Sequence, residues 1–508
     1  MTETGPIERH PTGIKGFDQA DLGGLPAGRP SLLTGTTGSG KTLFAVEFLA
    51  RGIQAFGEPG VFVTFEETPS DLRRNFASLN FPIAEWESKA KWAFVDASAD
   101  ISEEASVVGS YDFGALLARL VGAARRIGAR RMSLDSLDAV FTRFGQTPVV
   151  RQELHRIGRA LAELGITAVV TGERTLEHGP VSRYGVEEFV LDNVMILRNV
   201  LAHERRRRTI EIVKFRGAPH RTGEWLFTID PRDGLVVIPL AFLTSPPGPA
   251  SEIRVSGGNA DLDQMCGGGI FKDSVVLLTG PNGAGKTLAG LKFLAAGIAA
   301  GDRCLAFAFD ESREQLRRNA VGWGIDLDAA EHSGLVHVMC DLPEVASLED
   351  HFLRIRREVE EFAPDRIVID SVSALERIAS PRALLDFLMT LAAVVRQRGI
   401  TTLLTSSGRL MPQLAPSIAS EIASVADVTI SIGYFESGGQ IRRAIAVVQA
   451  RGTGHDYSVR QMTIDADGMQ IGEPVADAAH FLPDATSLIV SGGSAIPRGH
   501  EERSSPDE

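Results

Sequence analysis

The chain has 508 residues, of which 44% are hydrophobic and 23% charged, and its formal net charge at pH 7 is −13. This length predicts more than one domain, and the composition is typical of a folded α/β protein rather than a disordered chain. The acidic balance disfavours a nucleic-acid partner, and because the sequence has neither a long apolar run nor a signal-peptide core, we expect a cytoplasmic protein with no membrane partner.

Short apolar segments that resemble strands alternate with helical segments, and the series occurs twice in the same order. The strand-like segments fall at residues 30–35, 61–65, 130–135, 166–173, 192–199 and 210–217, and again at 274–280, 305–309, 365–370, 400–407, 426–433 and 445–452. The offset between copies is 245 positions from Lys41 to Lys286 and 235 from Asp135 to Asp370. Six matches in one order predict a tandem repeat.

Each copy is predicted to be an α/β domain with a mainly parallel twisted sheet covered by helices, a doubly wound arrangement. We expect an N-terminal domain at residues 1–245 and a C-terminal domain at residues 246–480. The junction at residues 244–252 contains three prolines and a glycine, which suit a linker. Residues 481–508 have too little apolar content to pack, so we expect a flexible tail there.

Both copies contain the pattern GxxxxGKT between an apolar strand and a helix. Such a P-loop directs backbone N–H groups at phosphate, while its Lys contacts the β- and γ-phosphates of ATP and its Thr binds Mg²⁺. The predicted nucleotide-binding residues are Gly38, Ser39, Gly40, Lys41, Thr42 and Leu43 in the first copy and Asn282, Gly283, Ala284, Gly285, Lys286, Thr287 and Leu288 in the second. ATP and Mg²⁺ are therefore the expected cofactors.

Acidic residues follow two of the strand segments in each copy. Asp135 and Asp370 end strands and precede a serine, where P-loop proteins place the acid that holds Mg²⁺ together with the P-loop Thr. Two further pairs of acids, Glu66 with Glu67 and Asp310 with Glu311, end other strands. A carboxylate there can orient water or take a proton from a hydroxyl, although an isolated pair would be read as exposed strand-end acids. Their recurrence favours catalysis, and Asp310 is also a candidate metal ligand.

A basic strand occurs late in each copy. The first carries Lys214, Arg216 and His220, and the second carries Arg451 and His455. A cation that reaches the γ-phosphate of a neighbouring subunit stabilises the transition state, as an arginine finger does. A basic strand is more often simply solvated, and spacing by itself leaves both alternatives open.

The two P-loops, the FEET segment at residues 65–68, the Asp-Ser strands, residues 179–217 and the second Arg-Gly strand together resemble the KaiC family over about residues 10–470. The resemblance implies two tandem RecA-like domains, a homohexameric double ring and ATP between subunits in both rings. It also implies a slow ATPase in the N-terminal ring, Ser/Thr autokinase activity in the C-terminal ring, and a site for a KaiB-like partner on the N-terminal ring.

The resemblance adds nucleotide-site residues to those of the motifs. By position these are Lys214, Phe215, Arg216 and His220 in the first copy and Trp323, Arg443, Arg451, Gly452, Thr453, Gly454 and His455 in the second. Three positions depart from the family pattern: the first C-terminal catalytic Glu is Asp310, the Lys before Arg-Gly is Gln449, and the Ser-Thr phosphosite pair is Ala423-Ser424. Ser424 is thus the expected phosphorylation site.

Two other functional classes are compatible with a RecA-like fold. One is a nucleic-acid motor, disfavoured by the acidic charge. The other is a nucleotide-gated hexameric scaffold with little turnover. We expect instead an ATPase and serine autokinase that acts in timing or signalling.

Overall fold

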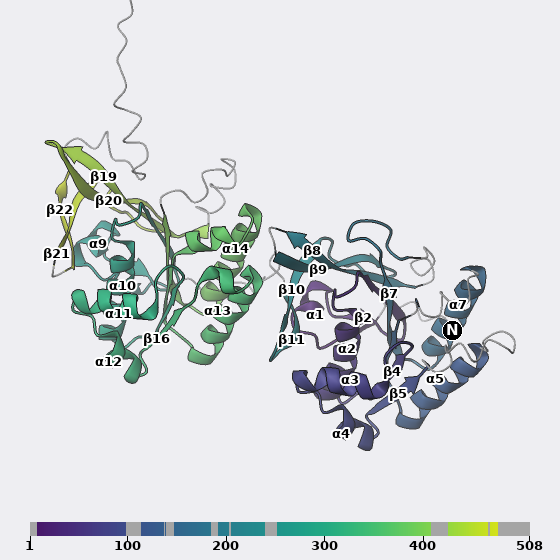
Figure 1. The fold of residues 1–508 in the computed structure, drawn as a ribbon. Coiled ribbons are helices and arrows are strands. Elements are labelled where there is room, and N and C mark those ends of the chain that lie inside the picture. Colours follow the sequence, from purple (N-terminus) through teal and green to yellow (C-terminus); the bar gives the residue numbers. More distant parts are fainter. Residues whose placement is uncertain are drawn as a thin grey trace, which may run out of the picture. The chain divides into compact units, whose positions relative to one another are not determined.

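The computed structural model describes residues 8–97, 113–136, 138, 147–183, 191–202, 205–238, 251–407, 425–465 and 468–475. The chain divides into two compact units, Met1–Leu243 and Thr244–Glu508, and each is an α/β domain of its own (Figure 1). Among the described residues, no helix is long and apolar enough to cross a membrane.

The first unit is built on a nine-stranded sheet in the order β11-β10-β9-β8-β3-β7-β6-β4-β5. Its strands are β3 (Pro30–Gly35), β4 (Gly60–Thr64), β5 (Trp92–Asp96), β6 (Arg131–Asp135), β7 (Thr167–Glu173), β8 (Asn193–Ala202), β9 (Arg205–Phe215), β10 (Glu224–Asp230) and β11 (Gly234–Ile238). In the order across the sheet, the neighbouring strands β5, β4, β6, β7, β3 and β8 run parallel to one another. Strands β9, β10 and β11 extend the sheet beyond β8, each antiparallel to its neighbour. A small antiparallel pair, β1 (Arg9–His10) and β2 (Leu25–Pro26), lies outside this sheet.

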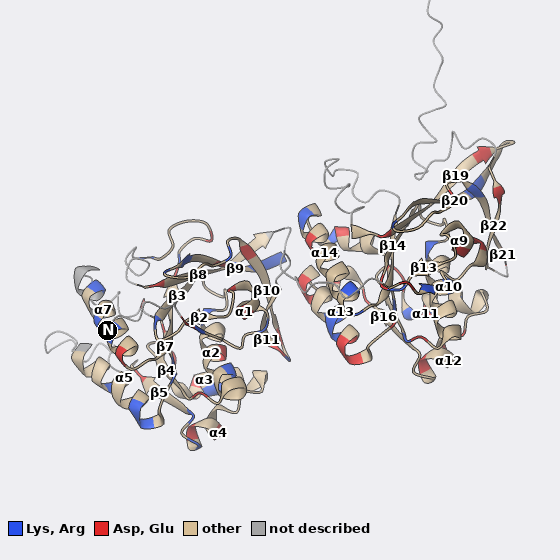
Figure 2. Cartoon of the chain, turned by 180° about the vertical axis from the view of Figure 1, so that it is seen from behind, with Lys and Arg blue, Asp and Glu red and all other residues tan. Residues whose placement is uncertain are grey.

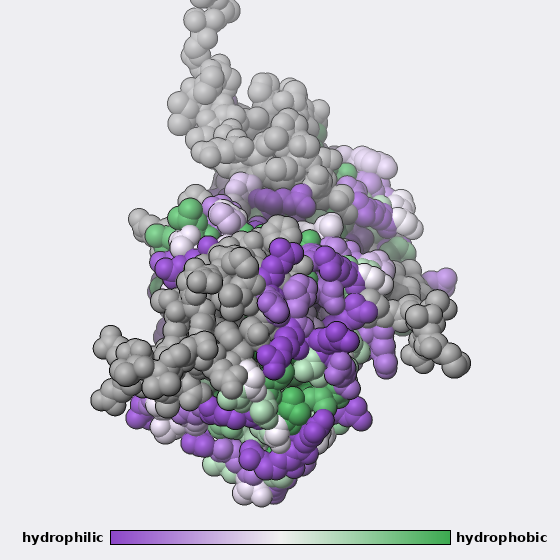
Figure 3. Space-filling view, turned by 90° about the vertical axis from the view of Figure 1, so that its right-hand side faces the viewer, coloured by the Kyte–Doolittle hydropathy of each residue, from purple (hydrophilic) through white to green (hydrophobic). Residues whose placement is uncertain are grey.

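Helices cover both faces of the parallel part. They are α1 (Phe17–Ala20), α2 (Lys41–Phe56), α3 (Pro69–Phe76), α4 (Ile83–Ser88), α5 (Phe113–Ile127) and α7 (Thr147–Glu163). Helix α2 packs on one face, and α5 and α7 lie on the other (Figure 1). Strands β3 and β4 are buried along their whole length, as expected for a parallel sheet covered on both faces. On the one face that Figure 3 shows, hydrophilic residues cover most of the described surface, with some hydrophobic residues between them.

The second unit repeats this arrangement with the sheet order β16-β15-β17-β18-β14-β19-β20-β21-β22. Its strands are β12 (Arg254–Val255), β13 (Ile270–Phe271), β14 (Val275–Gly280), β15 (Cys304–Ala308), β16 (Val336–Cys340), β17 (Arg366–Asp370), β18 (Thr401–Ser407), β19 (Val428–Ser437), β20 (Gln440–Ala450), β21 (Arg460–Asp465) and β22 (Gly468–Pro474). Its helices are α9 (Ala260–Met265), α10 (Lys286–Ala300), α11 (Arg313–Gly322), α12 (Leu327–His332), α13 (Leu348–Phe362) and α14 (Pro381–Gln397). Figure 2 shows charges of both signs on α13 and α14. The prediction of two tandem, mainly parallel α/β domains is confirmed.

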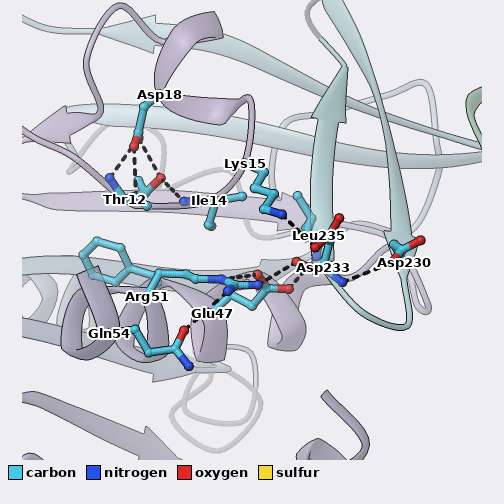
Figure 4. A network of polar contacts seen from close by, with 12 residues as sticks. Thr12, Ile14, Lys15, Asp18, Glu47, Arg51, Gln54, Asp230, Asp233 and Leu235 are labelled. Atoms are coloured by element: carbon cyan, nitrogen blue, oxygen red, sulfur yellow. Dashed lines mark hydrogen bonds and ion pairs between the residues drawn. The ribbon is translucent and has the colours of Figure 1, made fainter. Parts of the chain in front are cut away.

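The antiparallel extension of the first sheet is fastened to helix α2 by a buried carboxylate. Glu47, which is fully buried, accepts the backbone N–H of Leu235 at 2.5 Å, and Arg51 donates to the Asp233 carbonyl at 2.6 Å (Figure 4). Lys15 pairs with the Asp233 carboxylate at 2.7 Å. Gly234 at φ 72° leaves room for Glu47, because an added Cβ would lie 2.1 Å from its Oε1. These contacts fix the β10–β11 turn against the helix that begins at the P-loop lysine.

Candidate functional site

The P-loop of each domain connects the central strand to a helix that begins at the P-loop lysine. Gly40 and Gly285 precede these helices with φ of 102° and 111°, a left-handed conformation that favours glycine. Lys41 Nζ donates to the carbonyls of Gly35 and Thr36, both at 3.0 Å. Burial lowers the pKa of Lys41, and nearby carboxylates, Glu173 foremost, oppose that shift.

The second P-loop opens into a cavity of about 750 Å³. Lys286 Nζ donates to the carbonyls of Gly280 at 2.8 Å and Pro281 at 3.0 Å, and burial lowers its pKa. Among the cavity's lining residues are Asn282, Gly283, Gly285, Thr287, Leu288, Asp310, Glu311, Trp323, Asp370, Ser371, Ser373, Arg377, Ser407 and Arg443. This volume is within the range of pockets that hold a nucleotide-sized ligand.

The strand-end aspartates lie beside the P-loop threonines. Thr287 Oγ1 donates to Asp370 Oδ2 at 2.6 Å, and Thr405 donates to the other carboxylate oxygen. In the first domain Asp135 accepts hydrogen bonds from Thr42 and Thr171, and burial raises its pKa. Among the described residues there is no group of three or more acidic, His or Cys side chains that could hold a metal ion alone. A hydroxyl and one carboxylate per site nevertheless fit Mg²⁺, which commonly takes few protein ligands and completes its shell with water and phosphate oxygens.

The paired acids lie just before matching helices, α3 and α11. Glu67 Oε2 accepts from Asn75 Nδ2 at 3.0 Å, and Glu311 Oε2 accepts from Asn319 Nδ2 at 3.0 Å, so the two domains hold this carboxylate in the same way. Burial raises the pKa of Glu311, with the charge of Asp370 as a second cause. A raised pKa makes Glu311 a better proton acceptor.

The other acid of each pair contacts the residue after the strand-end aspartate. Ser136 donates to Glu66 at 3.2 Å, and Ser371 donates to Asp310 at 2.7 Å. Burial raises the pKa of Glu66. Asp310 also forms an ion pair with Arg377 at 3.0 Å. No sequence pattern pointed to Arg377, because it reaches Asp310 only through the fold, from the end of the short 3-10 helix Val372–Arg377.

The basic segments are only partly strands, because β9 ends at Phe215 and β20 ends at Ala450, so Arg216 and Arg451 lie in the turns that follow. Most of their residues lie apart from the P-loop residues and the paired acids. Lys214 donates to the Leu191 carbonyl at 2.8 Å, and Arg216, which is 58% exposed, pairs with Asp192 at 3.6 Å. The ring of Phe215 stacks with that of His220 at 6.5 Å. In the second domain the described residues Arg451, Gly452, Thr453, Gly454 and His455 are not among those that line the cavity.

Arginines near the start of each domain hold these basic segments. Arg254 Nη2 donates to Thr453 Oγ1 at 2.7 Å, and Arg9 donates to the Pro219 carbonyl while its guanidinium lies 4.3 Å from the Phe215 ring centroid. Arg443 and Trp323 do lie at the cavity, and Arg443 Nη2 donates to the Gly283 carbonyl at 3.3 Å. Ser424, Ala423, the residues from 481 onward and most of the junction at 244–252 lie outside the described residues.

Comparison with known proteins identifies the family. The family model described as ATPase: KaiC matches residues 10–241 and 255–476. The chain is 47% identical to the circadian clock protein KaiC3 of Synechocystis sp. over 94% of this chain and 95% of that protein. It is 44% identical to the circadian clock oscillator protein KaiC of Parathermosynechococcus lividus, over 93% of this chain and 86% of that protein. It is 43% identical to the circadian clock oscillator protein KaiC of Synechococcus elongatus, over 98% of this chain and 96% of that protein. The chain belongs to the KaiC ATPase family.

Proposed function

We propose that each domain binds and hydrolyses ATP with Mg²⁺, and that the chain forms a cytoplasmic homohexamer with nucleotide between neighbouring subunits. One observation carries the proposal: the same constellation of P-loop lysine, Thr–Asp pair and Asn-held glutamate is built twice. A duplicated arrangement of this kind is expected for a site under chemical constraint rather than for incidental surface acids.

The residues of each site would have the following roles in ATP binding and hydrolysis. Backbone N–H groups of the P-loops hold the phosphates, and Lys41 or Lys286 exchanges its bonds to loop carbonyls for bonds to the β- and γ-phosphates. Glu67 or Glu311 orients water and accepts its proton. Mg²⁺, held through Thr42 and Asp135 or Thr287 and Asp370, would neutralise charge on the phosphates.

The basic segments are proposed to act on the nucleotide of the neighbouring subunit. Arg216 and Arg451 are exposed, and Arg451 lies on the segment that does not line the cavity of its own domain. A cation supplied by a neighbouring subunit stabilises transition-state charge on the γ-phosphate. ATP would therefore complete an interface between subunits.

This predicts that ATP with Mg²⁺ shifts the protein from smaller species to hexamers, since a ligand that binds only the assembled interface stabilises it. Light scattering with and without nucleotide measures the shift. The double variant Arg216→Gln/Arg451→Gln should assemble less completely at the same ATP concentration. A wild-type protein that stays monomeric at saturating ATP contradicts the ring arrangement.

We also propose that the second domain phosphorylates a serine. Asp310 or Glu311 would accept the hydroxyl proton while Lys286 balances charge on the γ-phosphate. Asp310 is ion-paired with Arg377, whereas the hydrogen-bond partners of Glu311, Asn319 and Thr287, are neutral donors, so we favour Glu311 as the base. Glu311 also has the raised pKa that suits a base.

After incubation with ATP and Mg²⁺, intact-mass analysis should show one added phosphate, located on Ser424. Ser424 is the hydroxyl residue that remains at the two positions of the family's phosphosite pair. Ser424→Ala should abolish the addition, and Ser420→Ala serves as a control that keeps it. Phosphate on another residue, or none, contradicts the phosphosite and leaves the ATPase proposal standing.

We propose a role in timing or signalling, which the names of the relatives as circadian clock proteins support. A KaiB-like partner is a further proposal that rests on the family resemblance alone. A nucleic-acid motor is the second candidate, and the run Arg205–Arg208 at the start of β9 is the feature that favours it. The net charge of −13 opposes it.

A further inference from the structure

The P-loop of the first domain is held by a carboxylate that lies outside the loop. Glu177 is part of the connection between β7 and β8, and its Oε1 accepts the hydroxyl of Thr36, the second P-loop residue, at 2.5 Å. Its other oxygen, Oε2, accepts the backbone N–H of Asn199 on β8 at 3.0 Å. A single side chain therefore ties the P-loop to a strand of the central sheet.

Asn199 contacts the P-loop at a second point. Its Nδ2 donates to the carbonyl of Gly38, the fourth residue of the loop, at 3.3 Å. Its own carbonyl accepts from Arg206 Nη1 at 2.8 Å, so one member of the basic run on β9 helps to fix it. Asn199 is only 6% exposed. Side chains from outside the loop thus hold both Thr36 and Gly38.

The turn that carries Glu177 is itself anchored beside the P-loop. Arg174, which is buried, donates from Nε to the carbonyl of Pro180 at 2.9 Å and from Nη2 to that of Gly179 at 2.8 Å. The backbone N–H of Arg174 donates to the carbonyl of Gly35, the first P-loop residue, at 3.1 Å. These bonds hold the turn in place, so Glu177 meets Thr36 from a fixed position.

The second domain restrains its P-loop differently. Pro281 occupies the position of Thr36 and has no hydroxyl to donate. A proline ring fixes φ near −65°, so the backbone itself is restricted at that point. Gly283 matches Gly38, and its carbonyl accepts from Arg443 Nη2 at 3.3 Å. The first loop therefore depends on a hydrogen bond where the second has a ring.

We infer that Glu177 is a positioning residue for the first ATP site, which keeps the P-loop in the shape that receives the phosphates by holding Thr36 and Asn199. The inference rests on the proposed binding of ATP at this site. Without the carboxylate, the loop populates other conformations, and the apparent affinity falls by the fraction that remains competent. Bound phosphates then hold the loop themselves, so the chemical step keeps its rate.

The test measures phosphate release by the full chain against ATP concentration, with Glu311→Gln silencing the second domain. Glu177→Ala should raise KM by about tenfold and leave kcat nearly unchanged, because two hydrogen bonds to a charged group are lost. Thr36→Val removes one of these bonds from the other side and should also raise KM, and Glu177→Ala should add less in its presence. Glu163→Ala is the matched control, since it removes an exposed carboxylate that pairs with Arg159.

A rescue separates this role from a general effect on the fold. Among the described residues the backbone N–H of Thr36 donates no hydrogen bond, so Thr36→Pro removes none. In that chain Glu177→Ala should leave KM unchanged, because the ring restricts the loop in place of the carboxylate.

Three outcomes would overturn the inference. They are an unchanged KM in Glu177→Ala, a fall in kcat at constant KM, and an equal rise in KM with Thr36 and with Thr36→Pro. If the Glu311→Gln chain itself hydrolyses no ATP, the proposed first site fails, and the inference fails with it.

Discussion

Glu67→Gln is expected to lower ATP hydrolysis by the first domain at least about a hundredfold while ATP binding is kept, because a positioned general base contributes roughly 10²–10⁴ in rate. The glutamine has the size of the native side chain and can still bond to Asn75, which holds Glu67 at 3.0 Å. It cannot take the proton of the attacking water. Lys41→Ala should instead weaken ATP binding, because the loop then lacks its phosphate-binding ammonium.

Phosphate release by the full chain measures this effect when Glu311→Gln silences the second domain. Glu85→Gln is the matched control: it removes a carboxylate that pairs with Lys89 on the surface of the same domain and should leave the rate unchanged. If Glu67→Gln releases phosphate as fast as the control does, Glu67 is not the base of the first site.

The second large effect concerns the stability of the first domain and its dependence on pH. Asp21 is fully buried, and neither carboxylate oxygen has a hydrogen-bond partner among the described residues. Arg9 lies 3.6 Å away, and burial nevertheless raises the pKa of Asp21 from 3.8 to about 8. The folded state therefore holds a proton that the unfolded state releases. The free energy of unfolding should fall as pH rises from about 4 to about 8, by an amount on the order of 6 kcal/mol at most.

Asp21→Asn should be more stable than the wild type at pH 8, and the difference should vanish toward pH 4. Asp21→Cys also tests whether the buried carboxyl causes the pH dependence. Cys266 occupies the equivalent position in the second domain, and burial raises the pKa of its thiol to about 12, so a thiol there is neutral at pH 8. Unfolding followed by tryptophan fluorescence reports mainly on the first domain, which holds the buried Trp86, Trp92 and Trp225. Parallel stability curves for wild type and Asp21→Asn across this pH range would show that Asp21 does not titrate on unfolding.

The sequence alone predicted the repeat and the fold class, because strand periodicity and P-loop chemistry are local and occur twice. It also predicted that acids follow the strands at the P-loop edge, since the carboxyl ends of parallel strands share one edge of a sheet. In the structure Asp370 lies beside Thr287, and Glu311 lies beside Asn319. The role of each acid in catalysis stays a prediction.

Only the tertiary structure decided which further residues meet the P-loops. Glu173 was visible in the sequence as the end of a strand, but its place opposite Gly35 depends on the register between β7 and β3, strands that are far apart along the chain. Arg377 pairs with Asp310 and Asp21 is buried through contacts between segments that no sequence periodicity encodes. Local pattern determines which elements form, whereas the charge that each side chain experiences depends on neighbours that the fold brings together from distant parts of the chain.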